Sequence, residues 1–314
     1  HAHTTMTDTT NTRTDPDMDQ HSGQDSGNSA TANAPNDTNT DATRDTATSN
    51  AQGLDQETRS SRSLFHGVRR ALAFLTILPL RPLSGESGPP GGETLRWFPL
   101  VGLMLGAAWA WVDALLAMVL PPAPRAVLDV LFLALATGGL HLDGLADAAD
   151  GLLSHRGRER ALEIMRDSRV GTWGVLVLCA VLGLKAASLF VIIQRPHAAW
   201  ALLLVPAWSR AAMLVAMRAL PYGRGAEGMA HRMFQPGQPS LGPWLALWLT
   251  LLTAVCLGFL AMPGAVLCPL GFGVGLWAIL TWYRRVMGCV TGDMLGALGE
   301  AMEAWLLLLL AVQI

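Results

Sequence analysis

The sequence predicts an all-α integral membrane protein, a polytopic bundle of about six or seven transmembrane helices. Of its 314 residues, 51% are hydrophobic and only 15% are charged. The apolar residues gather in runs long enough to cross a bilayer, and the arginines gather in alternate segments between those runs. Both patterns are typical of a chain that crosses a membrane several times.

The N-terminal residues 1–60 differ from everything that follows them. They are rich in Thr, Asp, Asn, Ser, Gln and Gly and contain almost no large apolar side chain, so they cannot bury a core. We expect a disordered polar tail over 1–60 and an integral membrane domain over 61–314. The tail lacks the basic start and apolar segment of a secretory signal peptide.

Candidate spans follow along the membrane domain. A transmembrane helix needs about 20 apolar residues. Residues 304–314 are too few to cross unless their helix begins in the acidic segment before them. The run 64–80 contains Arg69 and Arg70 and has Pro79 at its end, which favours an interfacial or re-entrant helix. The other apolar runs cover residues 99–120, 126–142, 172–194, 198–217, 241–262 and 264–283.

The arginines predict the topology. Beyond the tail, they concentrate in segments 59–97, 156–169, 218–232 and 284–285, whereas the alternate loops carry only Arg125 and Arg195. The positive-inside rule makes the arginine-rich segments cytoplasmic, and the acidic motifs share those segments. The net charge of −2 gives no argument for nucleic-acid binding. The lipid bilayer is therefore the expected large partner, and a homo-oligomer stays open.

The segment 138–151 carries the first group of candidate metal ligands. If residues 143–150 are helical, Asp143, Asp147 and Asp150 lie at i, i+4 and i+7, within roughly a 60° arc of one face. Two carboxylates about 5 Å apart repel each other by on the order of 3 kcal/mol, so the cluster predicts a bound cation. Oxygen ligands favour Mg²⁺, with Mn²⁺ as the alternative.

A second acidic group lies in segment 288–303. Thr291 is placed to cap a helix whose first turn contains Asp293, and Glu300 and Glu303 follow on the same face. We expect Asp293 and Glu300 to complete the metal shell. The alternative is that Glu300 and Glu303 simply mark the membrane interface.

Cationic side chains supply the candidate substrate contacts. Arg166 and Arg169 lie in a loop of mixed charge, and a guanidinium group suits phosphate oxygens. Lys185 and Arg210 lie inside apolar runs, where an ionisable side chain indicates a functional site by default. Structural pairing with an aspartate is the alternative for these two. Arg224 follows Pro221 and Tyr222 at the end of the fourth run and is a further candidate.

Six motifs lie along the membrane domain, namely Arg96–Gly102, His141–Gly151, Glu163–Gly171, Ser209–Met213, Pro221–Arg224 and Thr291–Asp293. Taken together, they resemble the cobalamin synthase family over about residues 64–314. The motifs occur in the family's order, and their combination is specific. The resemblance implies a bacterial inner-membrane enzyme that transfers α-ribazole or its 5′-phosphate onto adenosylcobinamide-GDP, releases GMP and uses Mg²⁺.

The resemblance leads to a hypothesis for each candidate residue. Asp143, Asp147 and Asp150 would hold Mg²⁺ against the diphosphate of the substrate. The phosphate oxygens would contact Arg166, Arg169 and Arg224. A base is needed if the attacking group is a hydroxyl of ribazole, and His141 or Asp167 would supply it. His141 as a capping or packing residue stays the alternative.

Two other functions stay open at this point. The sequence Asp147–Gly151 begins like the signature of the CDP-alcohol phosphotransferases, although the arginine-rich run that follows does not continue that signature. A transporter of an anionic solute is the alternative from another class. Transporter sites usually lie near the bilayer midplane, whereas these acidic groups lie in cytoplasmic segments.

Overall fold

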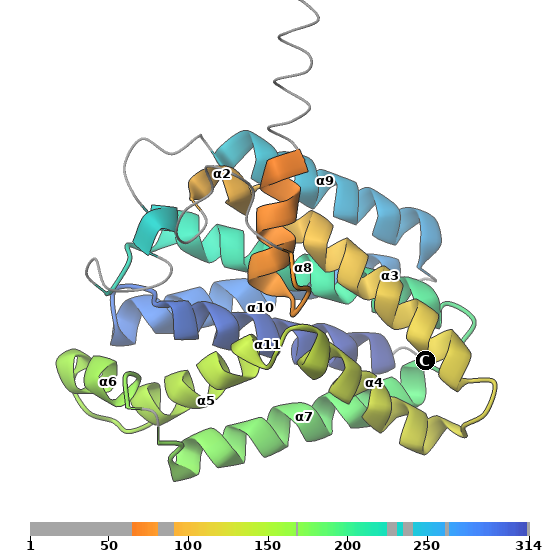
Figure 1. Ribbon diagram of the computed structural model, residues 1–314, viewed down its shortest axis with the longest axis horizontal. Coiled ribbons are helices and arrows are strands. Elements are labelled where there is room, and N and C mark those ends of the chain that lie inside the picture. Colours follow the sequence, from red (N-terminus) through yellow and green to blue (C-terminus); the bar gives the residue numbers. More distant parts are fainter. Residues whose placement is uncertain are drawn as a thin grey trace, which may run out of the picture. The chain divides into compact units, whose positions relative to one another are not determined.

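A computed structural model describes residues 65–80, 91–167, 169–224, 231–234, 241–260 and 264–312 (Figure 1). These residues form helices joined by short connections, and the predicted all-α fold is confirmed. The predicted tail, residues 1–60, lies outside the described ranges. In chain order, a helix over residues 65–75 precedes α2 (Gly92–Leu95), α3 (Phe98–Leu116), α4 (Pro122–Ala136), α5 (Leu140–Leu152), α6 (Arg158–Ile164), α7 (Thr172–Ile192), α8 (Ala198–Ala219), the 3₁₀ helix η1 (His231–Phe234), α9 (Leu241–Phe259), α10 (Gly264–Val286) and α11 (Gly292–Ala311).

Six of the described helices are long and apolar enough to cross a membrane, namely α3, α7, α8, α9, α10 and α11. The pair α4 and α5 would make a seventh crossing if it forms one broken span. The last helix resolves one question that the sequence left open. Because α11 begins at Gly292, the acidic segment belongs to it and gives it full crossing length.

The candidate span over 126–142 is not one continuous helix, because the chain bends by 91° between α4 and α5. The bend occurs at Gly138 and Gly139, whose φ angles of 62° and 70° lie in the left-handed region. Glycine adopts that region at no steric cost, whereas other residues are strained there. The bend turns α5 and its aspartates away from the axis of α4.

The central helices of the bundle are α8 and α11, which are mostly buried, whereas α7 and α9 are mostly exposed on their outer faces. Figure 1 shows α8 and α11 between α3 and α9 on one side and α5 and α7 on the other. Glycines allow the closest approaches. A Cβ atom added at Gly102 of α3 would come within 2.5 Å of the Cα atom of Ala207 in α8. Small residues let helix backbones pack closely within a bilayer.

The helices α5 and α11 also approach each other closely through glycines. A Cβ atom at Gly144 would lie 2.9 Å from the backbone oxygen of Asp293, and one at Gly296 would lie 3.2 Å from the backbone of His141. Larger residues at these positions would push the helices apart. The contact therefore brings the aspartate-rich start of α5 beside the start of α11.

Two connections are joined at the start of α11. Val290 donates a backbone hydrogen bond of 2.9 Å to Pro221, and Gly223 donates one of 2.8 Å to Val290. This pairing anchors the segment after α8 to the segment before α11. It places Arg224 within reach of Asp293, although 69 residues separate them in sequence.

Candidate functional site

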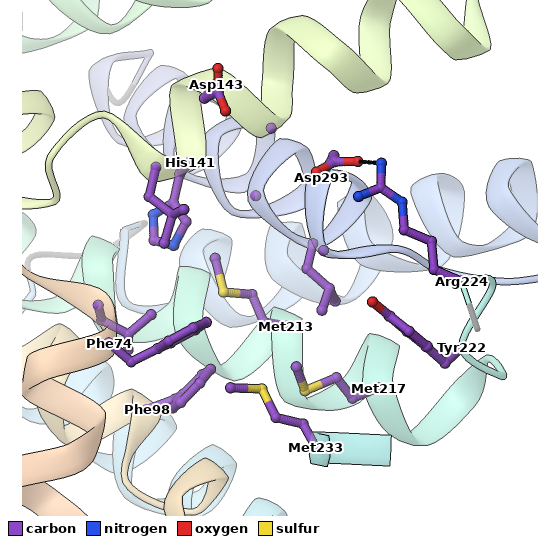
Figure 2. A pocket seen from close by; sticks show the side chains of 16 residues that line it. Phe74, Phe98, His141, Asp143, Met213, Met217, Tyr222, Arg224, Met233 and Asp293 are labelled. Atoms are coloured by element: carbon purple, nitrogen blue, oxygen red, sulfur yellow. Dashed lines mark hydrogen bonds and ion pairs between the residues drawn. The ribbon is translucent and has the colours of Figure 1, made fainter. Parts of the chain in front are cut away.

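A cavity of about 220 Å³ lies among the helix over residues 65–75, α3, α5, α8, η1 and α11. Asp143 and His141 reach it from α5, Asp293 from α11 and Arg224 from the segment after α8. Figure 2 shows the two aspartates and Arg224 on one side of the cavity and phenylalanine and methionine side chains on the other. Segments far apart in the sequence thus form one site.

Arg224 organises the polar side of the cavity. Its guanidinium group forms an ion pair with Asp293 and donates a 3.0 Å hydrogen bond to the backbone oxygen of Met165. The side chains of Arg224 and Asp293 are 18% and 19% exposed, so ligand and solvent still reach both. Arg224 therefore ties the α6 region to α11 while its charge faces the cavity.

The start of α11 has the predicted cap. The hydroxyl of Thr291 accepts a 3.2 Å hydrogen bond from the backbone N–H of Met294, which confirms Thr291 as the N-cap residue. The cap fixes the first turn, and with it the position of Asp293. The backbone N–H groups of a helix start carry partial positive charge, which suits the anionic side chain of Asp293.

The aspartates on this side of the cavity repel one another, and their chemistry fits a divalent cation. Residues 143–150 are helical as predicted. Asp147 lies within electrostatic range of Asp143, Asp293 and Asp150, and Arg224 opposes their repulsion. Within the described residues, no three acidic, histidine or cysteine side chains are spaced to enclose a metal by themselves. Mg²⁺ commonly binds through one or two carboxylates together with substrate phosphates and water, so Asp143 and Asp293 fit that mode.

Asp150 has a different role from the expected one. Its two carboxylate oxygens accept hydrogen bonds from the backbone N–H groups of Gly171, at 2.6 Å, and Gly174, at 2.9 Å. These donors belong to the start of α7, whose own N-cap residue, Gly171, has no side chain to offer. Asp150 therefore caps α7 from α5, and it does not line the cavity. A spacing argument within one helix could not show this partner.

We expect Asp150→Ala to lower the free energy of unfolding by about 1–2 kcal/mol, the usual cost of losing a helix cap. The measurement is thermal or denaturant unfolding of the detergent-purified protein. Asp150→Asn keeps one acceptor oxygen and should lose less. An unchanged stability together with a lost response to Mg²⁺ would instead restore Asp150 as a metal ligand.

Glu300 also departs from the expected metal role. It lies inside the bundle, and its carboxylate is 2.5 Å from the ammonium group of Lys185 in α7. Glu303 binds the same ammonium group at 2.6 Å and also pairs with Arg210 of α8. All four side chains are at most 8% exposed. Two cations and two anions thus balance one another within the bundle.

The side chains of Lys185 and Arg210 point into this buried ion network. Neither side chain lines the cavity, so their expected contact with substrate has no support in the geometry. The alternative of structural pairing describes them better, although their partners are glutamates rather than aspartates. Arg210 also lies 3.5 Å from Nδ1 of His141, which does line the cavity. The network therefore contacts His141 through the guanidinium group of Arg210.

The candidates between α6 and α7 lie outside the cavity. Arg169 donates hydrogen bonds of 2.7 to 3.2 Å to both carboxylate oxygens of Asp167. These bonds hold the pKa of the Asp167 carboxyl below its ordinary value, which makes Asp167 a weak proton acceptor. Of the two candidate bases, only His141 lines the cavity, so position favours His141. Arg166 and Arg169 are exposed on the neighbouring segment.

Sequence reasoning missed the apolar lining of the cavity. Phe74, Met217 and Met233 line it, yet none had been singled out. In a chain that is half hydrophobic, such residues have no pattern that distinguishes a ligand contact from a lipid contact. Phe98, Met213 and Tyr222 belonged to the motifs quoted above, but no role had been assigned to them.

Comparisons with known proteins agree with the motifs. A family model described as cobalamin-5-phosphate synthase matches residues 67–311. A curated protein from Desulforamulus reducens, named adenosylcobinamide-GDP ribazoletransferase, is 36% identical over 79% of this chain and 96% of its own length. A protein of the same name from Syntrophobacter fumaroxidans is 40% identical over 76% of this chain and 94% of its own length. No solved structure matches the chain.

Proposed function

Because the chain belongs to the cobalamin-5-phosphate synthase family, we propose that it transfers α-ribazole, or α-ribazole 5′-phosphate, onto adenosylcobinamide-GDP and releases GMP. A ribose hydroxyl of the acceptor forms the new bond to the phosphorus that carries the cobinamide oxygen. The bond from that phosphorus to the oxygen of GMP breaks, and the hydroxyl proton leaves. The product is adenosylcobalamin or its 5′-phosphate.

The polar side of the cavity carries this proposal. Transfer of a phosphoryl group depends on charge neutralisation and positioning more than on covalent help from the protein. Arg224 offers N–H donors to phosphate oxygens, and His141 is placed to take the proton of the attacking hydroxyl. Asp143 and Asp293, with Asp147 beside them, would hold Mg²⁺ or Mn²⁺. The ion would neutralise charge on the diphosphate.

The alternatives have less support. The family match covers nearly the whole described chain, whereas the likeness to CDP-alcohol phosphotransferases was limited to residues 147–151. A transporter would use Lys185 and Arg210 for its solute, yet the buried glutamates already neutralise both. The arrangement therefore favours the transferase over both alternatives.

We further propose that the protein lies in the bacterial inner membrane and that the cavity opens toward the cytoplasm. Among the described residues of the arginine-rich segments, Arg158 and Arg160 lie in α6, Arg218 lies in the last turn of α8, and Arg224 lines the cavity. The two arginines of the opposite loops have structural partners. Arg195 donates hydrogen bonds of 2.8 Å to the last carbonyl groups of α11, and Arg125 pairs with Asp113 at 2.8 Å.

GMP release tests the proposed function directly. Detergent-purified protein should release GMP from adenosylcobinamide-GDP only when α-ribazole or its phosphate and Mg²⁺ are both present. The assay separates GMP by chromatography and follows corrinoid product by its absorbance. Folded protein that releases no GMP with either acceptor would overturn the proposal, and CMP release from a CDP-alcohol would point to the other family.

A further inference from the structure

The cavity has two ends of different chemistry. Its polar end consists of Asp143, Asp293 and Arg224. Its apolar end consists of Phe74, Leu75, Phe98, Met213, Met217 and Met233. Figure 2 shows the labelled phenylalanine and methionine side chains across the cavity from the polar end, with the hydroxyl of Tyr222 pointing into the space between them. A ligand that fills the cavity must therefore be apolar at one end and polar at the other.

The size of the cavity limits which part of the two substrates can enter it. Pockets for drug-sized ligands usually span about 300–1,000 Å³, and this one has about 220 Å³. A two-ring base attached to a ribose fits that space, whereas the corrin macrocycle does not. The candidates for the apolar end are therefore the base of α-ribazole and the guanine of the GDP group.

The lining favours the base of α-ribazole over guanine. The six side chains of the apolar end contain no nitrogen or oxygen atom. Guanine has a carbonyl oxygen, an amino group and a ring N–H, and each would lose its hydrogen bonds to water without gaining any from these six side chains. The base of α-ribazole, 5,6-dimethylbenzimidazole, has an apolar six-membered ring with two methyl groups. Burial of that ring removes apolar surface from water without leaving a polar group unpaired.

Two features of the apolar end suit a flat aromatic ligand. Phe74 and Phe98 lie with ring centroids 6.1 Å apart and planes only 20° from parallel, so the two rings stack and supply aromatic surface to the cavity lining. Methionine sulfur makes favourable contacts with aromatic rings, and its flexible side chain adapts to the shape of the ligand. Met213, Met217 and Met233 supply three such side chains.

A second hollow leaves room for the other substrate. An open groove of about 460 Å³ adjoins the cavity and shares Met217, Tyr222 and Arg224 with it. The groove adds the cation of Arg218 to that of Arg224. The diphosphate of a larger substrate can therefore reach Arg224 from the groove while a nucleoside occupies the cavity.

We propose that the apolar end is the binding site for the base of α-ribazole, and that its side chains set the specificity for that base. The inference rests on the proposed function. The ribose then extends toward Asp143 and Arg224, where its hydroxyl meets the phosphorus of the other substrate. Met217 is the most informative residue to change, because it is half-buried and lies where the cavity joins the groove.

The test measures KM for each substrate separately in Met217→Ala. We expect KM for α-ribazole to rise by about tenfold, the scale on which an apolar pocket responds to lost methylene contacts. KM for adenosylcobinamide-GDP should rise by a smaller factor, since the cations of the groove that would bind its diphosphate, Arg218 and Arg224, are unchanged. The preference for α-ribazole over a benzimidazole riboside that lacks the methyl groups should also fall.

Two further variants separate a lost contact from a damaged fold. Met217→Leu keeps most of the side-chain volume, so its KM for α-ribazole should fall between those of the wild type and Met217→Ala. Met104→Ala removes the same side chain from the outer face of α3, where it is 44% exposed, and should leave both KM values unchanged. Thermal unfolding of each variant checks that the protein is folded.

Each outcome has a distinct meaning. A rise in KM for adenosylcobinamide-GDP alone would assign the cavity to that substrate and overturn the inference. Unchanged KM values for both substrates would also overturn it. Equilibrium dialysis with α-ribazole alone tests the site without turnover. If the wild type released no GMP, the proposed function would fail, whereas dialysis would still show whether Met217→Ala weakens binding of α-ribazole.

Discussion

Asp143→Asn is expected to lower the rate of GMP release by about 10³-fold, equivalent to about 4 kcal/mol of transition-state stabilisation. The carboxylate of Asp143 is exposed to the cavity and makes no hydrogen bond or ion pair within the described residues. This carboxylate therefore contributes little to the stability of the fold. Asparagine keeps the shape of the side chain and removes the charge, so under the proposed function the change would weaken cation binding at the site.

Stability and metal response distinguish this effect from damage to the fold. The free energy of unfolding should change by less than about 0.5 kcal/mol, as for most exposed positions. The Mg²⁺ concentration that gives half-maximal activity should rise by about tenfold or more, because one ligand is weakened. Both quantities are measured on protein in detergent, by denaturant unfolding and by a Mg²⁺ titration of GMP release.

Glu159→Gln provides the matched control. Glu159 is an exposed carboxylate on the neighbouring helix α6 and does not line the cavity. The substitution removes the same charge from the same end of the protein, so it tests for a general loss of negative potential. Equal losses of activity in Glu159→Gln and Asp143→Asn would contradict a metal site at Asp143. Full activity and an unchanged Mg²⁺ response in Asp143→Asn would do so as well.

The sequence predicted the spans well because long apolar runs have few physical outcomes other than membrane helices. It failed at the break between α4 and α5, because the run 126–142 is apolar apart from Asp129 and Thr137 before His141, and neither of these marks a bend. The only local signal was the pair Gly138 and Gly139. Glycines are also common inside transmembrane helices, so the pair alone does not predict a bend.

The polar side of the cavity was predictable because carboxylates beside a membrane cost free energy, so a group of them indicates a functional site. Their individual partners were not predictable. Asp150 is bound by the start of α7, and Glu300 by Lys185, 115 residues earlier in the chain. Spacing within one helix places a side chain on a face, but the neighbouring helix decides what that face meets.

The apolar end of the cavity could not be predicted from the sequence. Phe74, Met217 and Met233 come from three segments, and each looks like an ordinary core or lipid-facing residue in the sequence. Their common role depends on α3 approaching α8 and on the bend that carries α5 across the bundle. These are tertiary features, and no local pattern encodes them.

The second large effect is expected on stability, from a change in the buried ion network. Glu303 is 2% exposed and contacts both Lys185 and Arg210, so it compensates two cations at once. Glu303→Ala should lower the free energy of unfolding by about 3–5 kcal/mol, because uncompensated buried charge is costly. Activity should fall with stability, since Arg210 supports His141. Thermal and denaturant unfolding in detergent measure the loss.

A double-mutant cycle on Lys185 and Glu300 shows whether charge balance is the cause. Lys185→Met alone leaves Glu300 and Glu303 with only Arg210, whereas Lys185→Met with Glu300→Gln leaves Arg210 paired with Glu303. The double variant should therefore be less destabilised than the sum of the single variants, by about 0.5–3 kcal/mol. Additive losses would mean that each side chain contributes by packing alone. A positive coupling would show that the bundle requires equal numbers of opposite charges at its centre, which explains why these ions lie inside it instead of binding substrate.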